Sequence, residues 1–145
     1  MPTAELELKI VTPDGEVWAG QATSVVIPGL DGYFGVWHGH APLVAGVDIG
    51  AVFIKTPEEH VVKFIAVSGG FVEVNQHGVT VLAECAELAD DIDVIRADKA
   101  LERARERLSK HFADIDIERA HVALSKALNR KRVAERSKEK RTSIV

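Results

Sequence analysis

The sequence predicts a β-sandwich followed by an antiparallel two-helix hairpin, an α+β chain with separate β and α parts. All eleven glycines lie at or before Gly78 and all five prolines at or before Pro57. Because both residues punctuate turns and are costly inside helices, the turn-rich part is predicted to be β and the remainder helical. We therefore predict a sandwich domain (residues 1–88), a helical domain (89–137) and a disordered tail (138–145).

The strands are predicted from short runs rich in Val, Ile and Phe between turn signals. Residues 5–10 alternate charged and apolar side chains, the period of a strand buried on one face. The pair Gly69-Gly70 indicates a bulge or a close backbone approach. Since no crossover helix fits between the runs, a parallel α/β sheet is excluded. The predicted strands are 5–10, 17–27, 50–55, 61–67, 71–75 and 79–83.

The segment from Pro28 to Ala45 is the least strand-like part of the first domain. Its glycine spacing matches neither the nucleotide P-loop nor the dinucleotide fingerprint. Tyr33 and Phe34 are interpreted either as an exposed docking patch or as plain packing.

Two histidines and one cysteine are considered as possible metal ligands or reactive groups. His38 and His40 would share a face of an extended chain, but no third ligand is near in sequence, so hydrogen-bonded histidines are favoured over a metal site. Cys85 is predicted to be a small core residue, and as the single cysteine it excludes an internal disulfide.

The second domain is predicted to be two helices with one apolar stripe each. Asp91 or Asp93 is the candidate N-cap of the first helix, and Asp114 or Asp116 that of the second. Residues 109–114 form the connecting turn. The stripes are Ile95, Ala97, Ala100, Leu101, Ala104 and Leu108 in the first helix and Ile117, Ala120, Leu124, Ala127 and Leu128 in the second.

The folded-back hairpin is expected to be marginally stable. Each large side chain on its seam contributes roughly 1.5–3 kcal/mol if fully buried. Helical order costs about 1–2 kcal/mol per residue over some forty residues, and hydrogen bonds offset this cost only in part. The hairpin can therefore open if another surface offers its seam a better partner.

Charge is unevenly distributed. Residues 1–90 carry three lysines, no arginine and twelve acidic residues, a net −9, whereas residues 91–145 carry fifteen basic and ten acidic residues, a net +5. The helical part is thus expected to meet an acidic or phosphate-bearing partner. A nucleic-acid-binding adaptor is the alternative interpretation, but the acidic sandwich carries no basic stripe or aromatic platform.

Other classes are disfavoured by the sequence. No run approaches the ~18 apolar residues of a membrane span, and the first ten residues lack a secretory signal pattern, so we expect a cytosolic chain beginning near Met1. No nucleophile with a base, carboxylate pair or metal cluster indicates an enzyme.

Six segments, in order over about residues 5–135, resemble the epsilon subunit family of bacterial ATP synthase. One departure is Trp37-His38, where the family often has Leu-Pro, which changes the stiffness of that loop. The segments are VTPDGEVW (11–18), GHAPLVA (39–45), SGGFVEV (68–74), DIDVIRA (91–97), DID (114–116) and ALNR (127–130).

This resemblance implies a mechanical, non-catalytic role. The sandwich of the family clamps the gamma subunit and sits on the c-ring, at the cytoplasmic side of the cell membrane, and turns with the rotor to couple proton flow to ATP synthesis. By resemblance, the loop 29–39, which contains Asp31, Tyr33 and His38, would touch the c-ring, and His40 would lie near gamma. The isolated subunit is expected to be a monomer.

The family's helices inhibit ATP hydrolysis when they extend into the alpha/beta catalytic head. There the basic side of the helices meets acidic loops, and Arg130–Arg141 supplies seven basic residues, including Arg132 and Arg136, against two acidic ones. No cofactor is required by this role.

Some bacterial members also bind ATP between the helices through an I/L-D-x-x-R-A motif, here Ile92–Ala97. Lys126 stands where good binders have arginine, so a bidentate phosphate contact becomes a point charge. The alternative is that Asp93 merely caps the helix and pairs with Arg96. The residues implied for a regulatory ATP site are Glu87, Asp93, Arg96, Arg103, Lys126 and Arg130.

Overall fold

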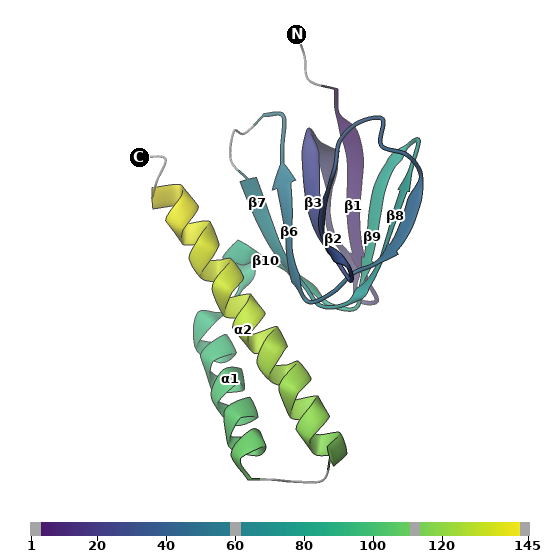
Figure 1. Cartoon of the computed structure of the whole chain (residues 1–145). Helices are drawn as coiled ribbons and strands as arrows, with labels where there is room; N and C mark the ends of the chain where they lie inside the picture. The colour runs from purple at the N-terminus through teal and green to yellow at the C-terminus, as the bar shows by residue number, and fades with distance from the viewer. Residues whose placement is uncertain (1–3, 59–61, 111–113, 143–145) are drawn as a thin grey trace. The chain divides into compact units, whose positions relative to one another are not determined.

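The structure is a computed structural model that describes residues 4–58, 62–110 and 114–142. The chain forms two compact units, Met1–Leu88 and Ala89–Val145, one built of strands and the other of helices (Figure 1). The predicted fold class, a β-sandwich followed by a two-helix hairpin, is confirmed.

The first unit contains ten strands in its described residues. They are β1 (Leu6–Thr12), β2 (Gly15–Ala22), β3 (Ser24–Gly29), β4 (Gly32–Val36), β5 (Leu43–Gly46), β6 (Gly50–Lys55), β7 (Val62–Val67), β8 (Gly70–Asn75), β9 (Gly78–Ala83) and β10 (Ala86–Leu88).

The strands make two five-stranded sheets, β2-β1-β9-β8-β5 and β10-β7-β6-β3-β4. Every pairing is antiparallel except that of β1 with β9, which joins the first strand of the chain to a late one. This pairing joins β1 and β2 to β9 and β8 within the first sheet. Its two strands are about seventy residues apart in the sequence, so local periodicity could not predict it.

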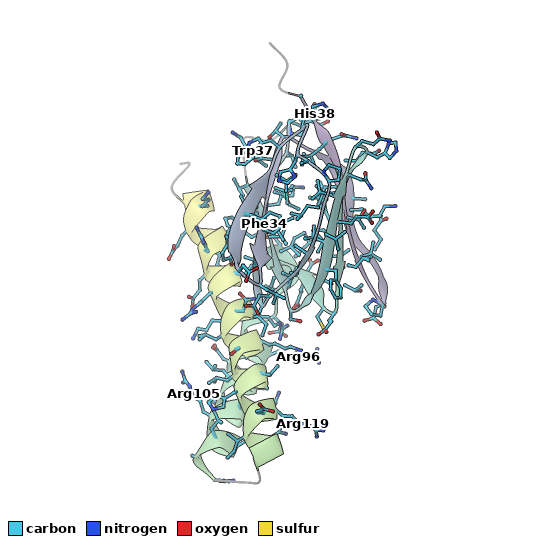
Figure 2. The ribbon with its side chains drawn as sticks, turned by 45° about the vertical axis from the view of Figure 1, so that its right-hand side comes forward. Phe34, Trp37, His38, Arg96, Arg105 and Arg119 are labelled. Carbon is cyan, nitrogen blue, oxygen red and sulfur yellow. The ribbon has the colours of Figure 1, made fainter. Side chains whose placement is uncertain are left out.

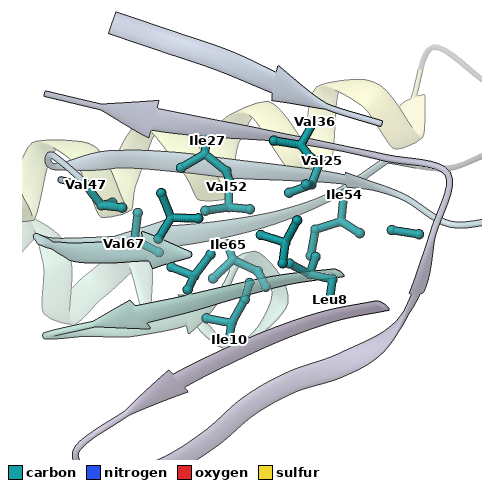
Figure 3. Packing of buried hydrophobic residues seen from close by; sticks show 14 of the residues in the cluster. Leu8, Ile10, Val25, Ile27, Val36, Val47, Val52, Ile54, Ile65 and Val67 are labelled. Carbon is teal, nitrogen blue, oxygen red and sulfur yellow. The ribbon is translucent and has the colours of Figure 1, made fainter. Parts of the chain in front are cut away.

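The core lies between the two sheets and is built from the alternating face of each strand (Figure 3). Leu8 and Ile10 from the first sheet and Ile27, Ile54 and Ile65 from the second are at most 1% exposed. Each contributes roughly 1.5–3 kcal/mol when it leaves water. The alternation at residues 5–10 is therefore confirmed as a half-buried strand.

Two strand predictions were wrong. The segment 17–27 is not one strand, because the chain leaves the first sheet after Ala22 and enters the second at Ser24. Thr23 makes this corner, and its backbone N–H and its hydroxyl both donate to the carbonyl of Lys55, at 2.8 and 3.1 Å. No glycine or proline stands at residues 22–24, so the sequence gives no turn signal at this corner.

The glycine-rich segment 28–45 also contains regular structure. It holds β4, which forms a hairpin with β3, and the start of β5. Gly32 sits at the hairpin turn with φ +122°, so glycine there serves the turn and does not interrupt the strands. The high glycine content hid both strands from a pattern search.

Gly70 marks a close backbone approach and not a bulge. The β8–β9 register runs without a shift from Gly70↔Ala83 to Asn75↔Gly78. Gly70 has φ +118°, and a Cβ there would overlap the carbonyl oxygen of Leu82. The neighbouring backbone is that of β9, so the close-approach alternative is confirmed.

The second unit contains a short 3-10 turn, η1 (Ala89–Asp91), followed by α1 (Val94–Ser109) and α2 (Asp114–Thr142). The two helices contact each other, and α2 also contacts η1. α2 continues through residues 138–142, where we expected a tail without regular structure. The connecting residues 111–113 lie outside the described part, as do the side chains of the candidate caps Asp114 and Asp116.

The buried stripe of the hairpin consists mostly of alanine. In α1, Ala97, Leu101 and Ala104 are buried. Ile95 was predicted on this stripe but is 70% exposed, because it lies six residues, or 240° of helix rotation, before Leu101. The stripe residues Ala120 and Ala127 are buried in α2, whereas Leu108, Leu124 and Leu128 are only half-buried.

We predict that Gly70→Ala destabilises the sandwich by about 1–3 kcal/mol more than Gly15→Ala. Both glycines have positive φ, +118° and +132°, but nothing lies within 4 Å of a Cβ at Gly15. Gly15→Ala thus measures the backbone strain alone, and the difference measures the overlap with β9. Urea unfolding of both variants gives the two values. Equal losses would contradict the close approach.

Candidate functional site

The six residues implied for a nucleotide site do not all lie on one unit. Asp93, Arg96 and Arg103 are at or in α1, and Lys126 and Arg130 are in α2. Glu87 is in β10, paired with Ala66 of β7, and so belongs to the sandwich unit. The structure therefore gathers five of the six on the hairpin.

Asp93 is the N-cap of α1, so the capping alternative is confirmed for it. Its Oδ1 accepts a hydrogen bond from the backbone N–H of Arg96 at 3.0 Å. This contact uses one carboxylate oxygen and orients the carboxylate toward the first turn. The other candidate, Asp91, lies in η1, and so it is not the cap.

The cationic residues of the candidate site share one side of the hairpin. Arg96 and Arg103 are seven residues apart and so lie on the same side of α1, as do Arg119 and Lys126 on α2, with Arg130 one turn further. Figure 2 shows Arg96 and Arg119 projecting on one side and Arg105 on the other. Hereafter the cationic side means Arg96, Arg103, Arg119, Lys126 and Arg130.

The cationic side has the features that a phosphate ligand needs. Arg96 and Arg103 are exposed, while Lys126 and Arg130 are half-buried. A half-buried charge lies in a region of lower effective dielectric constant than an exposed one, and this strengthens its interaction with an anion. Ala100 and Ala123, also half-buried, contribute only methyl groups on this side of the helices.

The end of α2 presents further positive charge. Arg132 and Arg136 are exposed, as are Lys138 and Lys140. Glu135 and Glu139 are exposed beside them, so the surface is mixed but net positive. An acidic protein surface is the partner that such a helix end attracts.

A second candidate site is an apolar row on the outer face of the first sheet. Phe71 of β8 pairs with Leu82 of β9, which pairs with Val11 of β1. Gly46 of β5 is the partner of Phe71 on the other side, and the side chain of Leu30 covers that glycine. We call Leu30, Phe71, Leu82 and Val11 the apolar row.

The apolar row is unusual because it faces water. Leu30 is 67% exposed, Phe71 62% and Leu82 52%, and the neighbouring Val44 is 71% exposed. Contiguous apolar residues at the solvent positions of a sheet mark an interaction surface. Sequence reasoning missed this row. The available signal was that Phe71 and Leu82 occupy the positions that alternation reserves for polar side chains.

The β3–β4 hairpin carries two residues implied for a partner contact. Asp31 is exposed at the turn, and Tyr33 is 56% exposed. The Tyr33 oxygen accepts a hydrogen bond from the backbone N–H of Ala51 at 3.2 Å, and its ring lies 5.9 Å from that of Phe53. Tyr33 is thus an exposed but anchored residue, whereas Phe34 packs against the core.

His38 and His40 lie in and beside the turn after β4, and the prediction of hydrogen-bonded loop histidines is confirmed for both. The Nδ1 of His38 is 2.9 Å from the carbonyl oxygen of Glu5, and that of His40 is 2.6 Å from the carbonyl oxygen of Ala41. Among the described residues, no three His, Cys, Asp or Glu side chains are grouped as a metal would require. Trp37, 59% exposed, covers Gly35 beside them.

Cys85 is exposed, so its prediction as a core residue was wrong. It lies between β9 and β10, where its carbonyl accepts a hydrogen bond from the N–H of Ser68 at 3.0 Å. The backbone is thus held while the side chain points outward.

Neither helix of the described chain has both the length and the apolar character needed to cross a membrane.

Family models match both units. Residues 5–89 match the β-sandwich domain of the ATP synthase delta/epsilon chain, and residues 90–135 match its long α-helix domain. The chain is 47% identical to the ATP synthase epsilon chain of Halalkalibacterium halodurans over 94% of its own length and 100% of that chain. It is 46% identical to that of Symbiobacterium thermophilum, covering 90% of this chain and 94% of that one.

Solved structures share the fold. A chain of the Euglena gracilis mitochondrial ATP synthase (OSCP/F1/c-ring) superimposes with a TM-score of 0.73 at 24% identity, covering 84% of this chain and 76% of that one. A chain from the central stalk and c-ring of the Tetrahymena thermophila mitochondrial ATP synthase gives 0.66 at 12% identity, covering 92% and 99%.

We predict that Asp93→Ala destabilises α1 by about 1 kcal/mol, because the first turn loses the acceptor of its Arg96 N–H. Amide hydrogen exchange of α1 measures the loss. Asp91→Ala is the matched control, since Asp91 is also exposed and acidic but lies in η1. If the amides of α1 exchange equally fast in the two variants, the capping hydrogen bond of Asp93 does not stabilise the helix.

Proposed function

The chain belongs to the ATP synthase delta/epsilon chain family, and from this membership we propose that it is a non-catalytic central-stalk subunit that turns with the rotor of an F-type ATP synthase. In this role it couples proton translocation to ATP synthesis, and it is held peripherally at the cytoplasmic face of the cell membrane by its partners. The apolar row is the observation that best supports the role, because a rotating clamp must grip a partner subunit.

We propose that the gamma subunit covers the apolar row. A rotor contact must resist torque, and buried aromatic and aliphatic anchors supply most of the energy of a stable protein interface. Phe71 and Leu82 are such anchors, set on central strands whose register fixes them. His40, whose Nδ1 lies next to the carbonyl oxygen of Ala41, would flank that contact.

The c-ring is the proposed partner of the β3–β4 hairpin. Tyr33 is presented by a hydrogen bond and a ring contact, which lower the entropy lost when it binds. Asp31 adds a negative charge at the same tip. The apolar row reaches the β3–β4 turn at Leu30, next to Asp31, so the two proposed contacts adjoin each other on the sandwich.

We predict that Phe71→Ser with Leu82→Ser weakens binding to purified gamma subunit at least about tenfold, because buried anchors of this kind are each worth 2 kcal/mol or more. The variant should remain folded, since the two side chains are 62% and 52% exposed. Thr80→Ser, on the same face of the same sheet, is the control. Unchanged affinity of the double variant for gamma would contradict the docking surface.

We propose that the hairpin inhibits ATP hydrolysis when it extends into the alpha/beta catalytic head. α2 has 29 residues, which is roughly 43 Å of helix, enough to reach deep into a partner. Its exposed Arg132 and Arg136 would meet acidic loops there. The alanine-rich seam supports this proposal, because few large side chains must leave their partners when the helices separate.

We propose further that ATP binds the cationic side of the folded hairpin. Guanidinium groups of Arg96, Arg103 and Arg130 can fork onto phosphate oxygens, and Lys126 supplies a point charge. The Asp93 oxygen that does not cap the helix can accept from the adenine amino group. Glu87 belongs to the sandwich unit and is not part of this proposal. Tenfold excess over its dissociation constant would add about 1.4 kcal/mol to the folded state.

We predict that Arg103→Ala weakens ATP binding by about ten- to a hundredfold, the cost of losing a hydrogen bond between charged groups. Lys126→Arg should tighten it, because a bidentate contact replaces a point charge. Arg105→Ala is the matched control, since Arg105 projects on the opposite side (Figure 2). Calorimetric titration of the isolated chain measures all three. No saturable binding at millimolar ATP, or equal losses in both alanine variants, would defeat the site.

A further inference from the structure

An ion pair joins the two helices on the side away from the candidate nucleotide site. Lys131 Nζ lies 3.0 Å from Asp98 Oδ1, with the two side chains 34% and 45% exposed. Asp98 follows Arg96 by two residues, or 200° of rotation, and shares its side of α1 with Arg105, seven residues later. Figure 2 shows Arg105 opposite Arg96. The pair can therefore act without competing with a ligand on the cationic side.

The pair is at the end of the hairpin that has no covalent link between the helices. Asp98 is the fifth residue of α1, and Lys131 follows it by 33 residues, across the turn that joins Ser109 to Asp114. Near the turn the chain itself keeps the helices close. At the level of Asp98 only side-chain contacts do so, and this is where the helices separate most when the hairpin opens.

Most apolar contacts around the pair are small, although Leu101, three residues after Asp98, and Val133, two after Lys131, are also buried. Ala97, next to Asp98, is 0% exposed, and Ala127 and Ala134, one turn to either side of Lys131, are 3% exposed. Buried methyl groups bring the helices close but remove little apolar surface from water. A single ion pair is consequently a larger share of the closing interaction here than it would be beside a core of leucines.

We propose that Asp98 and Lys131 form a salt-sensitive clasp that biases the hairpin toward its closed state. This inference deepens the regulation proposed above, because it assigns the closing bias to a contact separate from the nucleotide. The expected size is about a two- to threefold shift in the open–closed equilibrium, the usual worth of an exposed ion pair. A shift of this size affects the open–closed equilibrium noticeably only because few large side chains are buried between the helices.

The test is a double-mutant cycle on the full chain without nucleotide. Asp98→Asn, Lys131→Gln and the double variant are compared with the parent by amide hydrogen exchange of α1, which at 16 residues is marginal as an isolated helix and exchanges when the hairpin opens. Each single variant should speed exchange about two- to threefold, and the double variant no more than either. Glu102→Gln and Lys99→Gln, exposed charges on α1, are controls.

Asp98→Asn also removes a negative charge from near the start of α1, which weakens the helix by itself. The decisive comparison is therefore Lys131→Gln in the Asp98→Asn background. The ion pair is already absent there, so Lys131→Gln should not speed exchange further. The difference between parent and variants should also shrink in about 0.5 M salt, where charges are screened within a few ångströms.

Three outcomes would each overturn the clasp. The double variant could exchange faster than either single variant by the product of their effects, Lys131→Gln could change exchange no more than the controls do, or the differences could persist in high salt. Because no nucleotide or partner subunit is present, these outcomes are separate from a failure of ATP binding, which titration of the parent chain reports.

Discussion

The seam between α1 and α2 limits how firmly the second unit can hold together, and the proposed behaviour of the molecule depends on that limit. α1 buries two alanines and one leucine, Leu101. All eleven of the largest fully buried side chains among the described residues belong to the sandwich. At roughly 1.5–3 kcal/mol for each, the sandwich core outweighs the seam several-fold. One unit is thus held by a large core, and the other by a much smaller one.

This contrast suits the two units to different tasks. A clamp that transmits torque must not change register, and a one-residue slip in a strand of the sandwich would turn its buried side chains to water. The apolar row is mounted on β8 and β9, strands that the core holds in this way. A regulatory element must instead have two states of similar free energy, which a seam of alanines allows.

Much of the fold followed from local patterns in the sequence. Alternation identified the buried face of β1, and three- and four-residue spacing identified Ala97, Leu101 and Ala104. The N-cap at Asp93 was one of two aspartates named. These features depend on residues within one or two turns of each other, so the sequence nearby contains the whole cause.

The features that sequence reasoning missed depend on distant partners. The break at Thr23 is set by hydrogen bonds to Lys55, and the exposure of Cys85 by where β9 ends and β10 joins β7. The apolar row arises only when β1, β8 and β9 lie side by side, because its members are far apart in the chain. Ile95 was misplaced for a local reason: its steps to Ala97 and Leu101 are not helical neighbours.

The arrangement of charge on the hairpin explains how a weak seam could still be controlled. In the proposed scheme, an anion bound to the cationic side would favour the closed state, because only that state brings the charges of both helices together. On the other side Lys131 and Asp98 attract, and this attraction is present whether or not an anion is bound. In that scheme the closed state has one contact that depends on a ligand and one that depends on ionic strength. The open–closed equilibrium can then be shifted through either contact.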